Sequence, residues 1–131
     1  MTRLLIDTSA YSGFKRGVGA IVEAMRDADR LFMSGIVLGE LRAGFAAGDR
    51  QARNEAELRA FTILPRVEMV GVDEGTSVYY AAIYASLRRA GTPVPSNDLW
   101  IAATAMQHGL IVLTRDAHFR LVSQIVVQGL D

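Results

Sequence analysis

The sequence contains no cysteine, only three prolines and no long uninterrupted apolar run. Without cysteine the chain forms no disulfide framework, thiol nucleophile or thiolate metal site, and this lack suits a reducing compartment. Few prolines, together with 50% hydrophobic residues, argue against a disordered linker protein. The longest stretch free of Asp, Glu, Lys and Arg, from Leu99 to Thr114, falls short of the roughly 20 apolar residues of a membrane span. We therefore expect a single globular domain over residues 1–131, cytoplasmic and not bound to a membrane.

The charged residues balance, with 14 basic and 14 acidic side chains and a formal net charge of zero. A strongly basic composition, the usual sign of nucleic-acid binding, is therefore absent. Lys15 is the only lysine, so the other cations are arginines, which suit bidentate contact with phosphate and carboxylate. Genomic base composition could produce the same bias, so the arginine content by itself does not decide between the two explanations.

Short apolar runs alternate with helical patterns along the chain. Strands are predicted over 3–7, 31–34, 67–72 and 110–114, with a fifth candidate over 124–128. The first and fourth are continuously apolar, which is typical of strands buried on both faces of a parallel sheet. Helical spacing predicts helices over 18–25, 35–47 and 50–63, another between an Asp73 N-cap and Gly91, and a last one from a Ser96 cap to His108. Alternating strands and helices predict an α/β fold, a three-layer α/β/α sandwich with a mainly parallel central sheet of four to five strands.

Two acidic residues follow the predicted buried strands. Asp7 ends the first of these strands, and Asp116 lies two residues beyond the fourth. In open parallel sheets, reactive groups gather beyond the C-terminal ends of the strands. We therefore expect both carboxylates at the same edge of the sheet.

Two further acids are placed by helical spacing. Asp98 heads an apolar stripe in the first turn of its helix, where free backbone N–H groups and the helix dipole favour an anion. An ordinary first-turn acid is the alternative. Glu40 shares its helix face with apolar or small residues only, where an ionised carboxylate is costly unless it is paired or binds a metal. An ion pair with Arg42 or Arg16 is the alternative for Glu40, although helical geometry turns Arg42 away from it.

Four converging carboxylates would repel one another and raise their own pKa values. Cations would neutralise such a site, and all-oxygen ligands without cysteine or paired histidines select Mg²⁺ or Mn²⁺ over zinc. Carboxylates that hold one or two such ions are suited to hydrolysing phosphodiester bonds. With the four acids set aside, the chain has 14 basic against 10 acidic residues, so the metallated domain would present a basic surface to a polyanion.

Four segments carry these acids: LIDTS at 5–9, GELRAG at 39–44, PSNDLWIAATA at 95–105 and LTRDAHF at 113–119. In order and spacing the segments resemble the PIN-domain ribonucleases, and most closely the VapC-type toxins of bacterial toxin–antitoxin pairs. The resemblance runs from Arg3 to about Leu130, nearly the whole chain.

The resemblance implies a metal-dependent endoribonuclease that cleaves single-stranded RNA and inhibits translation or growth when free of its antitoxin. The catalytic and metal-binding quartet would then be Asp7, Glu40, Asp98 and Asp116, holding Mg²⁺, with Mn²⁺ able to substitute. A catalytically weak PIN-like module that binds metal, RNA or a protein is the alternative, although the intact quartet argues against it.

Residues beside the quartet receive supporting roles from the same resemblance. Thr8 and Thr114 match hydroxyl positions that would orient carboxylates or waters, and Asn97 matches a polar position just before the third acid. Arg42 and Arg115 are candidates for contact with RNA phosphate, with solvated surface arginine as the alternative. His118 is expected to pack or to cap the loop after the fourth acid rather than to act in catalysis.

The implied partners are RNA, a second copy of the chain and a small VapB-type antitoxin that would join it in a higher complex. The antitoxin tail would lay an apolar helix in a groove on the toxin. Candidates for that groove are Tyr11, Phe14, Val18, Ile21 and Met25, with core packing as the alternative explanation for most of them.

Overall fold

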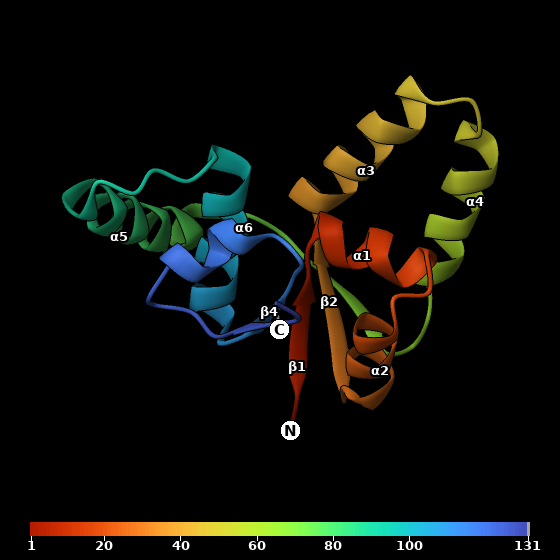
Figure 1. The fold of residues 1–131 in the computed structure, drawn as a ribbon, viewed down its shortest axis with the longest axis horizontal. Coiled ribbons are helices and arrows are strands. Elements are labelled where there is room, and N and C mark those ends of the chain that lie inside the picture. Colours follow the sequence, from red (N-terminus) through yellow and green to blue (C-terminus); the bar gives the residue numbers. More distant parts are fainter. Residues whose placement is uncertain (131) are drawn as a thin grey trace.

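Five strands form a parallel sheet with helices on both of its faces (Figure 1). The computed structural model describes residues 1–130. Its elements are, in chain order, β1 (Arg3–Ile6), α1 (Thr8–Lys15), α2 (Gly19–Asp27), β2 (Arg30–Ser34), α3 (Gly35–Ala47), α4 (Gln51–Thr62), β3 (Val67–Val70), α5 (Glu74–Ala90), α6 (Ser96–His108), β4 (Ile111–Leu113), the 3₁₀ helix η1 (Ala117–Leu121) and β5 (Val127–Gln128). The strand order is β3-β2-β1-β4-β5, so the predicted parallel sheet is confirmed.

The middle of the sheet forms the core. Strand β1 pairs with β2 on one side and with β4 on the other, and Leu5 lies opposite both Phe32 and Val112. Leu4, Leu5 and Ile6 are fully buried. A strand that is covered on both faces takes apolar residues at every position, because neither side of the strand is in contact with water.

The helices complete a three-layer sandwich. Helices α1 and α2 pack together on one side of β1, and α5 and α6 pack together on the other (Figure 1). Helices α3 and α4 form a hairpin in which α4 contacts β3, while α3 extends past the C-terminal end of β2 and contacts both α1 and α6. The predicted α/β/α sandwich is therefore confirmed. Within residues 1–130, no helix is long and apolar enough to cross a membrane.

The helix boundaries follow the chemistry of their caps. Asp73 and Thr76 form a reciprocal capping box at the start of α5, and Gly91 ends that helix in the left-handed conformation, as predicted. The Ser96 cap prediction is wrong by one residue. Ser96 is already helical and Pro95 is the N-cap, because the fixed φ of proline, here −54°, suits a helix entry and proline has no N–H to satisfy.

Helix α1 was not among the predicted elements. Its eight residues include Gly13 and polar residues that favour turns, so its intrinsic helix propensity is weak. The helix forms because the Asp7 side chain caps it and because Tyr11 packs edge-on against Phe61 of α4, with ring centroids 5.4 Å apart. Capping and tertiary packing therefore outweigh propensity here.

The five residues proposed for the antitoxin groove lie in the core or pack against it. Tyr11, Ile21 and Met25 are at most 3% exposed and belong to the core, while Phe14 and Val18 are partly buried against it. Core packing is therefore confirmed for these three. Tyr11 and Met25 also line hollows on the surface, so a role of these residues in the antitoxin groove stays a prediction.

The face of α3 that carries Glu40 is only partly buried. Val37 is enclosed, and Glu40 itself is half-buried, but Ala43, Gly44 and Ala47 are exposed. The apolar pattern predicted that this face excludes water, whereas α3 extends beyond the sheet and its last turns are exposed (Figure 1). Glu40 thus lies at the boundary between core and solvent.

Candidate metal centre

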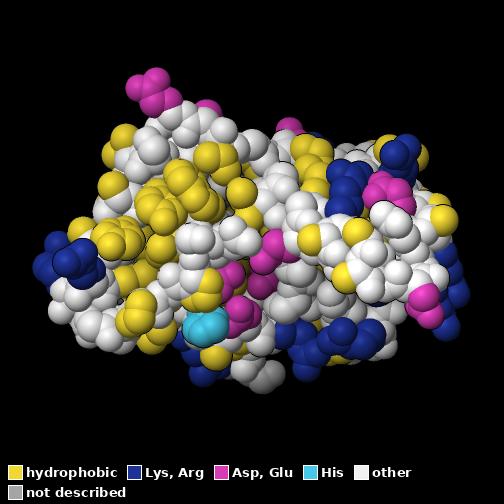
Figure 2. Space-filling view, turned by 90° about the horizontal axis from the view of Figure 1, so that it is seen from above, with side chains coloured by type: hydrophobic (Ala, Val, Ile, Leu, Met, Phe, Trp, Pro, Cys, Tyr) yellow, Lys and Arg dark blue, Asp and Glu magenta, His cyan; other side chains and the backbone are white. Residues whose placement is uncertain are grey.

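The C-terminal edge of the sheet carries a cluster of carboxylates. Figure 2 looks onto this edge and shows acidic side chains near the middle of the face with a histidine beside them, and hydrophobic side chains gathered to the left, over α5 and α6. The order β2-β1-β4 explains the convergence, because the chain after each of these strands must leave from the same edge.

Asp7 is the most enclosed acid of the cluster, with 3% of its surface exposed. Its carboxylate accepts hydrogen bonds from the backbone N–H of Ala10 at 2.8 Å, from Ser9 Oγ at 2.8 Å and from Thr114 Oγ1 at 2.5 Å. Burial raises the pKa of Asp7, and these hydrogen bonds partly offset that rise. Asp7 is therefore fixed in position as well as buried.

Two hydroxyl groups connect Asp7 to the loop after β4. Thr114 Oγ1, besides donating to Asp7, accepts from the backbone N–H of Asp116 at 2.8 Å. Ser9 Oγ accepts from the backbone N–H of Arg115 at 2.8 Å. Thr114 is thus placed where its predicted orienting role requires, whereas Ser9 was not predicted. The sequence did contain a sign of this contact, because Ser9 is a small hydroxyl residue two positions after Asp7, the aspartate that caps α1.

Glu40 is held by residues from two other helices. Thr8 Oγ1 donates to Glu40 Oε1 at 2.7 Å, and Asn97 Nδ2 donates to Glu40 Oε2 at 3.3 Å. Thr8 and Asn97, which were predicted from the sequence to lie beside the quartet, therefore both contact the Glu40 carboxylate. Arg42, the proposed ion-pair partner of Glu40, instead binds Glu55 through Nε and Nη2, each at 2.9 Å.

The two arginine candidates for RNA contact differ in their surroundings. The bidentate bond from Arg42, together with a hydrogen bond from Arg59, lowers the pKa of Glu55 to about 2, so RNA phosphate would have to compete with that carboxylate for Arg42. Arg115 is exposed and directly precedes Asp116. Contact of either arginine with RNA stays a prediction.

Asp98 and Asp116 face a common point together with His118. One ligand atom from each of these three side chains lies within 4.8 Å of the others. His118 Nδ1 is 2.9 Å from Asp116 Oδ1 and 3.6 Å from Asp98 Oδ2. Asp116 also caps η1 by accepting the backbone N–H of His118 at 2.9 Å. The expectation that His118 only packs or caps is therefore corrected: its ring joins the acidic cluster.

The electrostatics of Asp98 show that the four acids act on one region. Burial, followed by repulsion from Asp116, Glu40 and Asp7, raises the pKa of Asp98 to about 6, against an opposing contribution from His118. The side chain of Asp98 is only 13% exposed, so water screens this repulsion weakly. A divalent cation fits such a site because it neutralises charges that otherwise destabilise one another.

This pKa predicts a pH dependence for metal binding. A raised carboxyl pKa means that Asp98 is protonated below about pH 6 and must lose its proton before it can bind an ion. We expect the affinity for Mn²⁺ to fall by up to about tenfold for each pH unit below 6 and to level off above pH 7. Isothermal titration calorimetry between pH 5 and pH 8 measures it, and a constant affinity across that range would contradict the prediction.

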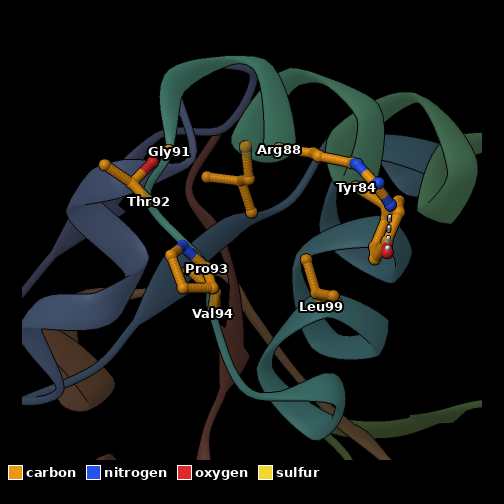
Figure 3. Close-up of a pocket in the computed structure, with 8 residues that line it drawn as sticks. Tyr84, Arg88, Gly91, Thr92, Pro93, Val94 and Leu99 are labelled. Atoms are coloured by element: carbon orange, nitrogen blue, oxygen red, sulfur yellow. Dashed lines mark hydrogen bonds between the residues drawn. The ribbon is translucent and has the colours of Figure 1, made fainter.

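A separate pocket lies away from the acids. It has a volume of about 260 Å³ and lies where the C-terminal part of α5 and the following loop meet α6 (Figure 3). Its lining residues are Tyr84, Leu87, Arg88, Gly91, Thr92, Pro93, Val94 and Leu99. None of the eight is acidic, so this pocket is separate from the carboxylate cluster.

Comparison with known proteins agrees with this arrangement. The PIN domain family profile matches residues 4–125. Ribonuclease VapC4 of Mycobacterium tuberculosis is 35% identical over 131 residues, covering 95% of each chain, and Ribonuclease VapC11 of the same species is 37% identical over 130 residues, covering 93% of this chain and 92% of the relative. Among solved structures, the DNA-bound VapBC of Salmonella typhimurium superposes with a TM-score of 0.84 at 29% identity, covering 98% of both chains. VapBC-5 of M. tuberculosis, a toxin–antitoxin system, gives a TM-score of 0.76 at 26% identity, covering 97% of this chain and 98% of that one.

Proposed function

The chain belongs to the PIN-domain family, and from this membership we propose that it is a VapC-type toxin, an endoribonuclease that hydrolyses RNA phosphodiester bonds. Relatives named ribonucleases match it over nearly its whole length, and its structural neighbours are VapBC toxin–antitoxin complexes. Free of its antitoxin, such an enzyme inhibits translation or growth by destroying RNA. The cytoplasm, where the RNA is, is the proposed compartment, and residues 1–131 are proposed to form one nuclease domain.

The observation that carries the proposal is the convergence of four carboxylates at one sheet edge. Asp7, Glu40, Asp98 and Asp116 would hold Mg²⁺, for which Mn²⁺ could substitute, since carboxylate oxygens are the preferred ligands of both ions. A bound ion of this kind supplies an activated water and stabilises the leaving oxygen. The raised pKa of Asp98 supports the proposal, because the repulsion behind it would be relieved by a cation.

The neighbouring polar residues would hold the carboxylates in position. Thr114 and Ser9 restrict Asp7, and Thr8 and Asn97 restrict Glu40. A carboxylate whose orientation is fixed before the ion arrives loses less conformational entropy on binding. Arg115, exposed beside Asp116, is proposed to contact the phosphate that enters the site.

The proposed protein partners are a VapB-type antitoxin and a second copy of the chain, with which the antitoxin would form a higher complex. Figure 2 shows the hydrophobic side chains of one region gathered over α5 and α6. There Tyr80 stacks against Tyr84 and packs against Trp100, with ring centroids 6.4 and 4.2 Å apart. Aromatic side chains are enriched in protein interfaces, so we assign this region to the second copy. Sedimentation of the purified chain and of its Tyr84→Asp variant tests the assignment, and an unchanged dimer in the variant contradicts it.

Metal-dependent RNA cleavage is the direct test of the enzyme. We expect the purified chain to cut single-stranded RNA in Mg²⁺ or Mn²⁺, EDTA to abolish cutting, and excess metal to restore it. Labelled RNA resolved on a denaturing gel measures this. Cutting that persists in EDTA, or in Asp7→Ala protein shown to be folded, would remove the metal-nuclease proposal. RNA binding without cutting in either metal would instead support a catalytically weak binding module.

A further inference from the structure

His118 lies among the acids, but the proposed function gives it no role. It is one of only two histidines in the sequence, and its side chain is 52% exposed, beside Asp98 and Asp116. Figure 2 shows a histidine at the rim of the acidic cluster on the open face of the molecule. An imidazole in this position can reach an ion that the carboxylates hold.

The spacing of the three side chains is close to that of ligands around one metal ion. Ligands about 2.1 Å from an octahedral ion lie about 3.0 Å apart at adjacent positions and about 4.2 Å apart at opposite ones. His118 Nδ1 is 2.9 Å from Asp116 Oδ1 and 3.6 Å from Asp98 Oδ2. The three ligand atoms lie within 4.8 Å of one another, so changes in their separations of roughly half an ångström would bring them onto one ion.

The backbone around His118 is well fixed. Asp116 caps η1 by accepting the His118 N–H, and the next residue, Phe119, is fully buried in the core. The histidine therefore extends from a short helix that is anchored on both sides. Its ring can reach the acids without rearrangement of the loop, which lowers the entropic cost of adding it to a metal site.

We propose that His118 is a nitrogen ligand of the divalent ion, alongside Asp98 and Asp116, and that it shifts the preference of the site from Mg²⁺ towards first-row transition ions. The inference rests on the proposed metal centre and concerns which ions that centre prefers. Mg²⁺ favours all-oxygen coordination, whereas imidazole suits the transition ions, whose affinity for nitrogen ligands rises from Mn²⁺ to Co²⁺. The 2.9 Å contact between His118 Nδ1 and Asp116 Oδ1 would then give way to bonds from both atoms to the same ion.

Binding of Co²⁺ and of Mg²⁺ to the purified full chain tests this inference without an activity assay. We expect His118→Asn to weaken Co²⁺ binding by roughly 10–100-fold, the range seen even for partners that support a metal ligand, and Mg²⁺ binding by less than about threefold. His108→Asn is the matched control, because His108 is exposed at the opposite end of α6, about 15 Å along the helix from Asp98. Calorimetry of both ions with wild type and both variants gives the ratio of affinities.

Nuclear magnetic resonance adds a readout that does not depend on a variant. In wild-type protein, diamagnetic Zn²⁺ should shift the ring-nitrogen signal of His118 and leave that of His108 unchanged. Equal losses of Co²⁺ and Mg²⁺ affinity in His118→Asn, or no loss of either, would overturn the proposal, as would unmoved His118 ring signals. Because metal binding is measured apart from cleavage, a chain that binds Co²⁺ through His118 but cuts no RNA would contradict the proposed function alone.

Discussion

Replacing Asp98 with asparagine should abolish RNA cleavage and, in the absence of metal, make the protein more resistant to heat at neutral pH. Asparagine keeps the shape of the side chain but removes the charge of a proposed metal ligand, so we expect a loss of activity on the order of 1,000-fold or more. Stability should rise because the negative charge of Asp98 is unfavourable in the folded protein. Its pKa there is about 6, raised by burial and by the neighbouring acids.

The direction of the stability change follows from proton linkage. Between the usual carboxyl pKa and about pH 6, folded Asp98 holds a proton that the unfolded chain has lost, so the free energy of unfolding decreases as pH rises. The full cost is present above pH 6, and Asp98→Asn removes it. The variant should therefore gain stability over wild type at pH 7.5 and gain little or none at pH 4.

Thermal unfolding in EDTA at these two pH values, with cleavage measured in Mn²⁺, checks both effects. Asp27→Asn is the matched control, since Asp27 is 75% exposed at the end of α2, where it pairs with Arg26. An Asp98→Asn protein that still cuts RNA at more than a tenth of the wild-type rate would contradict the metal-ligand role. A variant less stable than wild type at pH 7.5 would contradict the electrostatic account of the site.

Replacing Thr114 with valine should disorganise the site while leaving the four acids in the chain. Thr114 is fully buried, and its hydroxyl donates to Asp7 and accepts from the backbone N–H of Asp116. Valine has nearly the same volume but lacks the hydroxyl, so the Asp7 carboxylate and the Asp116 backbone N–H each lose that hydrogen bond. We expect a stability loss of about 1–3 kcal/mol and a cleavage rate reduced by roughly 10–100-fold.

Serine at this position is the informative comparison. Thr114→Ser keeps the hydroxyl and removes only a methyl group, so it should retain most of the activity that valine loses. The pH profile adds a second readout: loss of the Thr114 hydrogen bond should raise the pKa of Asp7 further and move the profile of the valine variant to higher pH. Chemical denaturation and cleavage rates across pH 5–9 measure these effects. Equal activity in the valine and serine variants would show that the hydroxyl does not position Asp7.

The polar network explains how one surface could both bind metal and remain folded without it. Asp7 is buried and surrounded by donors, whereas Asp98 is near the surface and faces the other acids. Burial and the neighbouring acids raise the pKa of Asp98 to about 6, and the extensive core around β1 stabilises the fold despite this unfavourable charge. Metal binding should then stabilise the protein, because only the folded chain brings these carboxylates together.

The sequence by itself determined the fold class, the parallel sheet and the placing of Asp7 and Asp116 at one edge of it. These features depend on patterns within a few residues: an unbroken apolar run is best satisfied by a strand covered on both faces, and the residue after such a strand must emerge at its end. Asp73 and Gly91 marked the limits of α5 for the same reason, since capping is local chemistry.

Only the tertiary structure decided which side chains meet. Glu40 is held by Thr8, 32 positions before it, and by Asn97, 57 positions after it. His118 joins Asp98 across a turn whose course depends on the burial of Phe119. Local periodicity carries no information about contacts between distant segments, because packing of whole elements sets those distances. The four acids and the neighbouring Thr8, Thr114 and Asn97 could therefore be named from the sequence. Which carboxylate each of these three contacts, the part played by Ser9 and the position of the His118 ring beside the acids required the folded chain.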